Sequence, residues 1–420
     1  MKKKKNRKKL NYVFLFMASF LGVITVGSLF LVGVYTYQIA TRNGVKGEEL
    51  PKEWMDQSGA LNTGIEVIPF PGSEYEKQDA EKDVKTKDDS SEGIVIGAGS
   101  KETGEITFAF AGDVMFDDSY SIMNYYRSTG GEVTSCFDSV LLETMRGADV
   151  FMVNNECTFT KRGEPTPEKT YTFRSNPDNV NILKEMGVDL VSLANNHAYD
   201  YGEVSLLDSL ATLEGAGIGI AGAGRDSEEA QRPVIFEAGG TKVAILAATQ
   251  IERMSNPDTK EATEKSPGVF RCFEPDRLCE VIRETKKTVD FVIVYVHWGT
   301  ENTTEIDWAQ RDQAIMFEEA GADLIIGDHP HCLQGMTYIN DTPVIYSLGN
   351  FWFNSKTVDT GLLQLTVNGN KIKRLSFLPA RQQSCQTKTL SREQREAVLS
   401  YLGELSPGVI IDEKGAISKQ

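Results

Sequence analysis

The chain has 420 residues, of which 40% are hydrophobic and 25% are charged. This composition supplies a large buried core and excludes a disordered, collagen-like or disulfide-stapled class. Lys and Arg number 44 against 60 Asp and Glu, so the formal net charge is −16. An acidic chain lacks the basic surface that neutralises phosphates, and nucleic acid is therefore excluded as the expected partner.

The charge is divided unevenly along the chain, because seven of the first nine residues are basic and the remainder carries −23. Residues 10–41 contain no charged side chain, and this run exceeds the roughly 20 apolar residues that span a bilayer as a helix. We predict a basic cytoplasmic tail over 1–9 and a transmembrane signal-anchor over 10–41. The positive-inside rule then makes this a single-pass protein of the cell membrane with an extracellular C-terminal domain.

The alternative for the apolar segment is a cleaved signal peptide, whose apolar region is usually only about 7–15 residues long. Either outcome exports the rest of the chain. Residues 42–104 are polar, and 74–92 carry densely mixed charges with one β-branched apolar residue, Val84. Such a segment buries too little apolar surface to offset its ordering entropy, so we predict a disordered stalk over 42–104.

The six cysteines show no CxxC spacing typical of metal or redox sites. In an exported chain disulfides are permitted, and Cys272 and Cys279 could form one. We expect the other four cysteines to be buried thiols.

From Ile106 onward, short apolar runs alternate with amphipathic stretches, which is typical of a sheet covered by helices. Three strands are preceded by a helical run, a glycine, one residue and an aspartate, with the glycines at Gly147, Gly187 and Gly321. Glycine past a helix end favours a left-handed cap that returns the chain to the sheet. This repetition predicts crossover units whose strands share one direction.

The later part of the chain has a different pattern. Residues 361–367 and 372–378 alternate apolar and polar residues, which predicts an antiparallel hairpin. Residues 391–402 predict a helix with Ser391 as its N-cap. We place the main domain at 105–385 and a C-terminal helix and tail at 386–420.

Polar side chains follow six predicted strands at the point where each strand ends. In open α/β sheets the ligand crevice lies beyond the carboxyl ends of the strands, so we expect these side chains to meet at the mouth of the sheet. They comprise Asp113; Asn154, Asn155 and Glu156; Asn195, Asn196 and His197; His297, Trp298 and Glu301; Asp328, His329 and His331; and Asn350.

All four histidines of the chain belong to these clusters. Each one alone could be a hydrogen-bonded loop histidine, but their joint restriction to the strand ends favours a shared metal or catalytic site. Together with Asp113, Glu156 and Asn196 they form a nitrogen- and oxygen-rich set without thiolate. Such a set suits one or two divalent ions of Mn, Fe, Zn or Mg.

These motifs resemble the CapA-like poly-γ-glutamate synthesis proteins of the calcineurin-like metallophosphoesterase superfamily, over about residues 106–378. The resemblance implies a four-layer α/β/β/α sandwich. It also implies metal ligands at Asp113, Glu156, Asn196, His297, His329 and His331. Met115 departs from the pattern, because it stands where a ligating histidine is usual, and this favours a centre with one ion or weak occupancy.

Other residues near these ligands have candidate roles beside them. His197 is the candidate general acid, with Asp200 beside it. Asp200 and Glu301 could orient imidazoles from a second shell, or they could be a helix-start aspartate and a solvated loop glutamate. Asn195, Trp298 and Asn350 are candidates for substrate or second-shell contacts, with sheet packing the alternative for Trp298 and turn capping that for Asn350.

The resemblance implies a membrane-anchored extracytoplasmic protein that acts in synthesis, export or anchoring of an anionic capsule polymer beside membrane synthase or exporter subunits. Two alternatives stay open: an extracellular metallophosphoesterase or other metal-dependent hydrolase, and a non-catalytic scaffold for a membrane synthase complex. Because the exterior carries −23, a polyanion would need local cations to be held.

Overall fold

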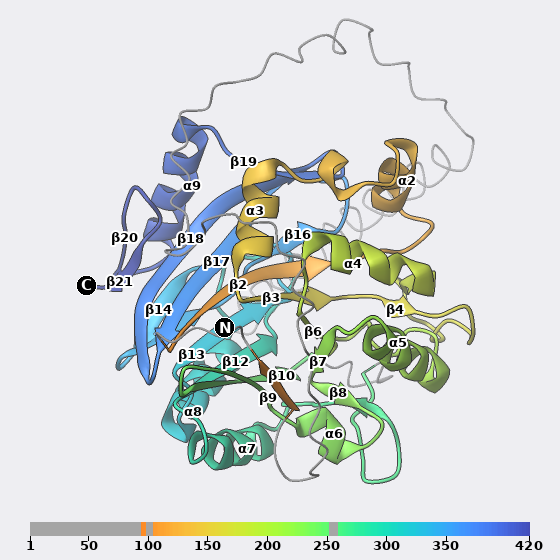
Figure 1. Cartoon of the computed structure of the whole chain (residues 1–420), viewed down its shortest axis with the longest axis horizontal. Coiled ribbons are helices and arrows are strands. Elements are labelled where there is room, and N and C mark those ends of the chain that lie inside the picture. Colours follow the sequence, from red (N-terminus) through yellow and green to blue (C-terminus); the bar gives the residue numbers. More distant parts are fainter. Residues whose placement is uncertain (1–93, 98–103, 252–258) are drawn as a thin grey trace, which may run out of the picture. The chain divides into compact units, whose positions relative to one another are not determined.

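The computed structural model describes residues 94–97, 104–251 and 259–420 (Figure 1). The predicted tail over 1–9, the anchor over 10–41 and most of the stalk lie outside these ranges. Within them, no helix combines the length and the apolar character that crossing a bilayer requires.

The prediction of a disordered stalk was wrong for Ile94–Gly97, which form strand β1 paired with β9 (Val234–Ala238). The reason is local, since Ile-Val-Ile has high strand propensity.

Two large sheets organise the described residues. The first has seven strands in the order β1, β9, β10, β12, β13, β15, β14 and the second has eight, in the order β19, β18, β17, β2, β3, β6, β7 with β16 beside β2. The remaining strands of the first sheet are β10 (Thr241–Thr249), β12 (Phe291–His297), β13 (Leu324–Asp328), β14 (Met336–Ile339) and β15 (Thr342–Ile345). Those of the second are β2 (Glu105–Val114), β3 (Val150–Asn155), β6 (Leu190–Ser192), β7 (Gly219–Ala221), β16 (Asn350–Trp352), β17 (Val358–Asn368), β18 (Lys371–Gln383) and β19 (Gln386–Thr389).

Helices and short strand pairs complete the fold. The helices are α2 (Ser121–Ser128), α3 (Ser139–Gly147), α4 (Val180–Met186), α5 (Glu203–Gly215), α6 (Ser227–Gln231), α7 (Asp276–Lys286), α8 (Trp308–Ala320) and α9 (Arg392–Glu404). The short pairs are β4 (Thr158–Phe159) with β5 (Arg174–Ser175), β8 (Ala223–Gly224) with β11 (Gly268–Val269), and β20 (Val409–Ile411) with β21 (Ile417–Lys419).

Three apolar clusters separate four layers. Between the two sheets, Phe108 of β2 meets Phe236 of β9 edge to face, with ring centroids 5.9 Å apart. Outside the eight-stranded sheet, α2 to α5 cover a second cluster, and outside the seven-stranded sheet, α7 and α8 cover a third. Figure 1 shows α7 and α8 beside β12 and β13, and α4 and α5 at the other side of the molecule. The structure is thus a mixed α/β fold with helices outside two facing sheets.

The polar strand ends belong to two sheets and not to one. Strands β2, β3, β6 and β7 run parallel in one sheet, and β10, β12, β13 and β15 run parallel in the other. The prediction of a single sheet mouth was therefore wrong. Periodicity within each crossover unit fixes local strand direction, but it carries no information about which sheet a unit joins.

The residues before Asn350 were expected to form one strand that ends there, but they are divided between the sheets. β15 ends at Ile345, Gly349 adopts φ +63°, and β16 then pairs with the end of β2. Gly112 on β2 permits this contact, because a Cβ there would lie 1.9 Å from the carbonyl oxygen of Gly349. The amide of Asp113 donates to that same carbonyl at 3.0 Å.

Two of the three predicted glycine caps are confirmed. Gly187 ends α4 with φ +86° and Gly321 ends α8 with φ +112°. The third was wrong, since Gly147 is the last residue of α3 and the cap is Ala148 in an extended conformation.

The aspartates that precede these strands have a role that the pattern alone did not indicate. Each carboxylate accepts from the backbone N–H of a neighbouring strand: Asp149 from Thr107 at 2.8 Å, Asp189 from Phe151 at 3.0 Å and Asp323 from Val292 at 2.7 Å. These bonds satisfy donors at the start of the adjacent strand, so the aspartates fasten neighbouring strands together.

The C-terminal elements follow the sequence pattern. β17 and β18 form the predicted antiparallel pair, and α9 begins at the predicted N-cap, where Ser391 and Gln394 make a reciprocal capping box. The domain boundary expected after residue 385 falls between β18 and β19, which are hydrogen-bonded neighbours in one sheet.

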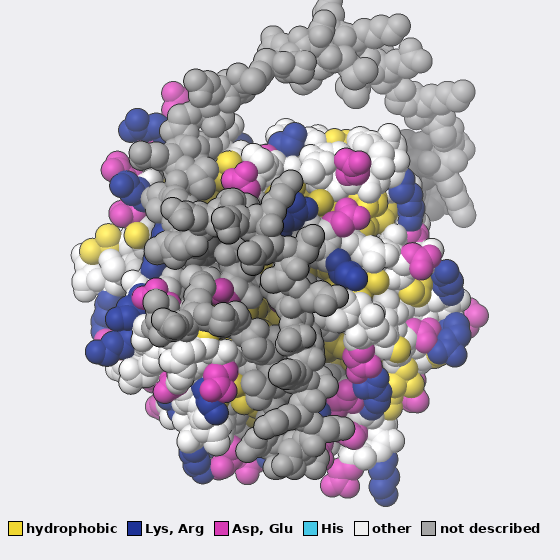
Figure 2. All heavy atoms as spheres, in the orientation of Figure 1, with side chains coloured by type: hydrophobic (Ala, Val, Ile, Leu, Met, Phe, Trp, Pro, Cys, Tyr) yellow, Lys and Arg dark blue, Asp and Glu magenta, His cyan; other side chains and the backbone are white. Residues whose placement is uncertain are grey.

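All six cysteines are free thiols, so Cys272 and Cys279 do not form a disulfide. On the face shown in Figure 2, acidic and basic side chains are interspersed over the described surface.

Candidate metal centre

Side chains from the ends of both sheets converge on one buried polar centre. Asp113 lies at the end of β2 and Glu156 follows β3 in the eight-stranded sheet, while His297 ends β12 in the other sheet. Nε2 of His297 lies 2.8 Å from Oδ1 of Asn196 and 3.7 Å from Oε1 of Glu156. The structure thus brings together residues that are more than a hundred positions apart in sequence.

Three of the four histidines and the nearby acids form overlapping groups with metal-ligand spacing. In each group the ligand atoms lie within 4.8 Å of one another. The groups are Glu156 with His297 and His329; Asp113 with Glu156 and His331; Asp113 with His297 and Asp328; and Glu301 with His329 and His331. Together they contain every histidine and carboxylate expected to ligate a metal, and they add Asp328 and Glu301. Asn196, the remaining expected ligand, has its side-chain oxygen 2.8 Å from Nε2 of His297.

Four carboxylate oxygens in this centre lack a hydrogen-bond partner among the described residues. They are both oxygens of Glu156, Oδ2 of Asp328 and Oδ2 of Asp113, and all three side chains are fully buried. Oδ2 of Asp113 has an ion-pair contact instead, with Nδ1 of His331 at 3.3 Å. Burying an unpaired carboxylate costs several kcal/mol, on the order of 2–7 even for a neutral polar group. A divalent cation would satisfy these oxygens, so the donor set fits a metal.

The surroundings of His297 support the same conclusion. Its Nδ1 lies 2.9 Å from Oδ1 of Asp328, and a proton there leaves a lone pair on Nε2. That nitrogen faces Oδ1 of Asn196 at 2.8 Å and Nδ1 of His329 at 3.0 Å. With Nε2 unprotonated, His297 can ligate a cation, and a ligating imidazole that donates its other N–H to a carboxylate is the usual arrangement at metal sites.

The loop that carries the last two histidines has an unusual backbone. His329 has φ +91° and His331 has φ +57°, on either side of Pro330. Non-glycine residues with positive φ cost about 1–3 kcal/mol each, and such strain concentrates at functional sites. Here it directs both imidazoles into the centre, where Nδ1 of His331 lies 2.9 Å from Oδ1 of Asn350 and 3.3 Å from Oδ2 of Asp113.

Burial and mutual charge shift the pKa values of these groups in opposite directions. Burial, and then the charge of Asp113, raise the pKa of Glu156 and of Asp328 well above the usual range. Burial lowers the pKa of His297 to about 3 and that of His329 well below the usual range. Although burial opposes charge on both partners, the nearby His331 lowers the pKa of Asp113, and the charges of Glu156 and Asp113 raise the pKa of His331 to about 9.

The metal-free protein is expected to lose stability as pH rises, because His331 binds its proton more tightly when folded than at its ordinary pKa of 6.5. This contribution is complete below the unfolded pKa and is lost as pH rises through about 9. At 1.36 kcal/mol per unit, we expect a loss of up to about 3 kcal/mol. Urea unfolding in the presence of a chelator measures it, and an unchanged slope in His331→Gln would contradict the assignment.

His197 lies between two acidic side chains. Its Nδ1 lies 2.8 Å from Oδ2 of Asp200, and its Nε2 faces Oε1 of Glu156 at 3.8 Å. Asp200 is fully buried and also binds Nζ of Lys169 at 2.6 Å, and the same ammonium donates to the backbone carbonyl of Asn196. Burial lowers the pKa of His197. Asp200 thus fixes the tautomer of His197 and turns Nε2 toward the centre.

The other residues expected at the site lie in different parts of the structure. Asn195 is buried and bonds Asn154 and the amide of His197, so it orients the loop after β6. Asn350 contacts His331, and the exposed Glu301 lies at the edge of the centre. Trp298 lies in the apolar cluster under α8, stacked on Phe317 with its indole N–H bonded to Tyr346, which is a packing position.

Met115, which replaces the expected histidine, is fully buried in the apolar cluster on the helix side of the eight-stranded sheet. The sequence placed Asp328 and Asn154 in the strand-end clusters without a ligand or site role, and Lys169 was not among the expected residues. Asp328 stands at a strand end directly before His329, and this position was the signal that could have added it to the site. Asn154 bonds Oδ1 of Asp113 at 2.8 Å. Nothing in the sequence distinguished Lys169.

Comparison with known proteins places the described domain among capsule proteins. A family model described as "Bacterial capsule synthesis protein PGA_cap" matches residues 107–355. "PGA biosynthesis protein CapA" of Bacillus subtilis is 32% identical over 229 residues, which are 54% of this chain and 59% of that protein. "Capsule biosynthesis protein CapA" of Bacillus anthracis is 30% identical over 226 residues, which are 52% and 54%. The chain thus spans little more than half the length of these curated relatives.

Proposed function

The chain belongs to the bacterial capsule synthesis protein family PGA_cap, and from this premise we propose that it acts in the formation of an anionic capsule polymer of the poly-γ-glutamate type. The names of its two Bacillus relatives support this polymer class. The family expected from the motifs is confirmed. The function of the whole chain, its substrate and its partners belong to the proposal.

The proposal includes a metal-dependent, hydrolase-like site in a fold of the metallophosphoesterase type. The observation that carries it is the burial, beside the four histidines, of four carboxylate oxygens that accept no hydrogen bond from the described residues. Asp113, Glu156, Asn196, Asp328, His297, His329 and His331 would hold the ion. A divalent ion bound there supplies Lewis acidity and lowers the pKa of water to about 7.

The protein's own groups would position the substrate and move a proton. His197 presents Nε2 to the centre while Asp200 holds its Nδ1 at 2.8 Å, so His197 would exchange a proton with the reacting group at Nε2. Lys169 fixes both Asp200 and the backbone of Asn196, which keeps the loop after β6 in place. Glu301, at the exposed edge, would face the entering polymer.

We further propose that residues 10–41 anchor the protein in the cell membrane, with the globular domain outside and beside membrane synthase or exporter subunits. The basic residues among positions 2–9 and the uncharged apolar run support this topology.

Complementation of a deletion strain tests the function directly. The full chain should restore cell-bound polymer, whereas His197→Ala should reduce polymer at least about tenfold, because general acid–base catalysis contributes about 10²–10⁴-fold. Polymer is measured after alkaline release, with the amount of protein in the membrane fraction as the control. If His197→Ala restores polymer fully, the protein acts as a scaffold. If the purified chain hydrolyses a phosphoester and the deletion strain still makes polymer, a phosphoesterase role replaces the proposal.

A further inference from the structure

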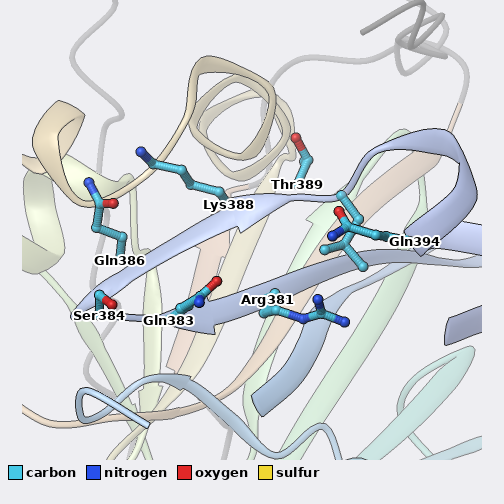
Figure 3. A pocket seen from close by; sticks show the side chains of 8 residues that line it. Arg381, Gln383, Ser384, Gln386, Lys388, Thr389 and Gln394 are labelled. Atoms are coloured by element: carbon cyan, nitrogen blue, oxygen red, sulfur yellow. The ribbon is translucent and has the colours of Figure 1, made fainter. Parts of the chain in front are cut away.

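A pocket outside the polar centre is lined by two basic residues and by uncharged groups, nearly all of them polar. Its volume is about 230 Å³, and Figure 3 shows its side chains along the β18–β19 hairpin and at the start of α9. No carboxylate is among its lining residues, although the chain has a net charge of −16. The lining consists of Arg381, Gln383, Ser384, Gln386, Lys388, Thr389, Leu390 and Gln394.

The strand register places the basic and amide side chains on one face of the hairpin. Arg381 is directly opposite Lys388, and Gln383 is directly opposite Gln386. Because side chains two residues apart on a strand share a face, these four form one ladder. Like charges opposite each other are destabilising on their own, and an anion bound between them removes that cost.

Only one of the two basic side chains, Arg381, forms an ion pair with a neighbouring carboxylate. Arg381 also bonds Asp359 of β17, its neighbour on the other side, at 2.7 Å, which offsets its charge. Lys388 is exposed and makes no ion pair with the other described residues. The row of Asp359, Arg381 and Lys388 therefore carries two positive charges and one negative charge.

The hairpin is held in place by the rest of the fold. Its two-residue turn, Ser384 and Cys385, has positive φ at both positions, +51° and +66°, where Asn-Gly is usual. Contacts from two other segments stabilise the turn. In residues 352–355, Trp352 donates to the carbonyl of Cys385 and the carbonyl of Ser355 accepts from the N–H of Ser384, while Gln386 donates to the carbonyl of Ser135. A site fixed before binding loses less entropy when a ligand arrives.

We propose that this pocket binds the carboxylates of the acidic polymer at a second position, separate from the metal centre, and holds the chain while the centre acts on it. This inference rests on the proposed function for the identity of the polymer. Lys388 and Arg381 would pair with polymer carboxylates, and the amides of Gln383, Gln386 and Gln394 would bond its amide backbone. The pocket is smaller than the roughly 300–1,000 Å³ of whole small-molecule sites, so it suits one unit of a longer chain.

Binding of fluorescent poly-γ-glutamate to the full chain, followed by anisotropy at low salt, tests the pocket. Arg381→Gln with Lys388→Gln should weaken binding about tenfold. The matched control is Lys371→Gln with Lys373→Gln, two exposed lysines on the same strand β18. This control removes equal charge and should change binding less than about twofold.

Several outcomes would overturn the inference. Equal weakening by both double variants means long-range charge attraction, and no weakening by the first variant means that the pocket does not bind the polymer. Displacement of the polymer by inorganic phosphate at lower concentration than by tri-γ-glutamate means a phosphate site. The proposed function is judged separately, by complementation of the deletion strain with the wild-type chain and with His197→Ala.

Discussion

Glu156→Gln is expected to abolish polymer formation while leaving the fold intact or more stable. Both oxygens of Glu156 are buried without a hydrogen-bond partner, and burial raises its pKa well above the usual range. In the metal-free protein this acid must be buried either charged or with a proton taken up, and glutamine avoids both costs, so the free energy of unfolding should stay constant or rise by up to about 2 kcal/mol. Metal retained after gel filtration should fall at least about tenfold, since even outer-shell changes cost about 10–100-fold.

A matched change at a structural acid should give the opposite pattern. Asp323 accepts from the amide of Val292 at 2.7 Å and from Lys286 at 2.6 Å, away from the polar centre. Asp323→Asn should lower stability by about 1–2 kcal/mol and leave metal content unchanged. Elemental analysis and urea unfolding of both variants measure the two effects. A stability loss without metal loss in Glu156→Gln would show that the carboxylate is structural.

Gly112→Ala is expected to have the largest effect on folding. The new Cβ would lie 1.9 Å from the carbonyl oxygen of Gly349, which is backbone and cannot rotate away. Either β16 must leave β2 or β2 must shift, and both movements displace Asp113 and Asn350. We expect a loss of about 4 kcal/mol or more, which is a large part of the roughly 5–15 kcal/mol that stabilises a typical domain. Soluble yield and the unfolding midpoint measure it.

Gly147→Ala is the control for this change. Gly147 is the last residue of α3, its φ is not positive, and a Cβ added there would meet no heavy atom within 4 Å. Alanine there should be neutral or should stabilise the helix by up to about 1 kcal/mol. Equal behaviour of the two glycine variants would mean that the close approach of Gly112 to Gly349 is not needed for folding.

The sequence predicted most of the local structure. The strand of Phe291–His297, the hairpin of β17 and β18, and the N-cap of α9 all follow from residue periodicity and capping preferences, which act over a few neighbours. One of the failures was also local in origin. Gly147 carries the same Gly-x-Asp signature as Gly187, but its helix continues through the glycine.

By itself, the sequence determined which residues enter the candidate centre: four histidines, each at a strand end, and the acids Asp113 and Glu156. These residues could be identified from the sequence because polar side chains at the ends of buried strands have few structural roles other than forming a binding or catalytic site. Only the tertiary structure decided that the centre lies between two sheets, that Asp328 joins it and that Lys169 supports Asp200. These facts depend on contacts between separate segments, some of them more than a hundred residues apart. Pairing across such distances is set by the packing of the whole core, and no pattern along the chain records it.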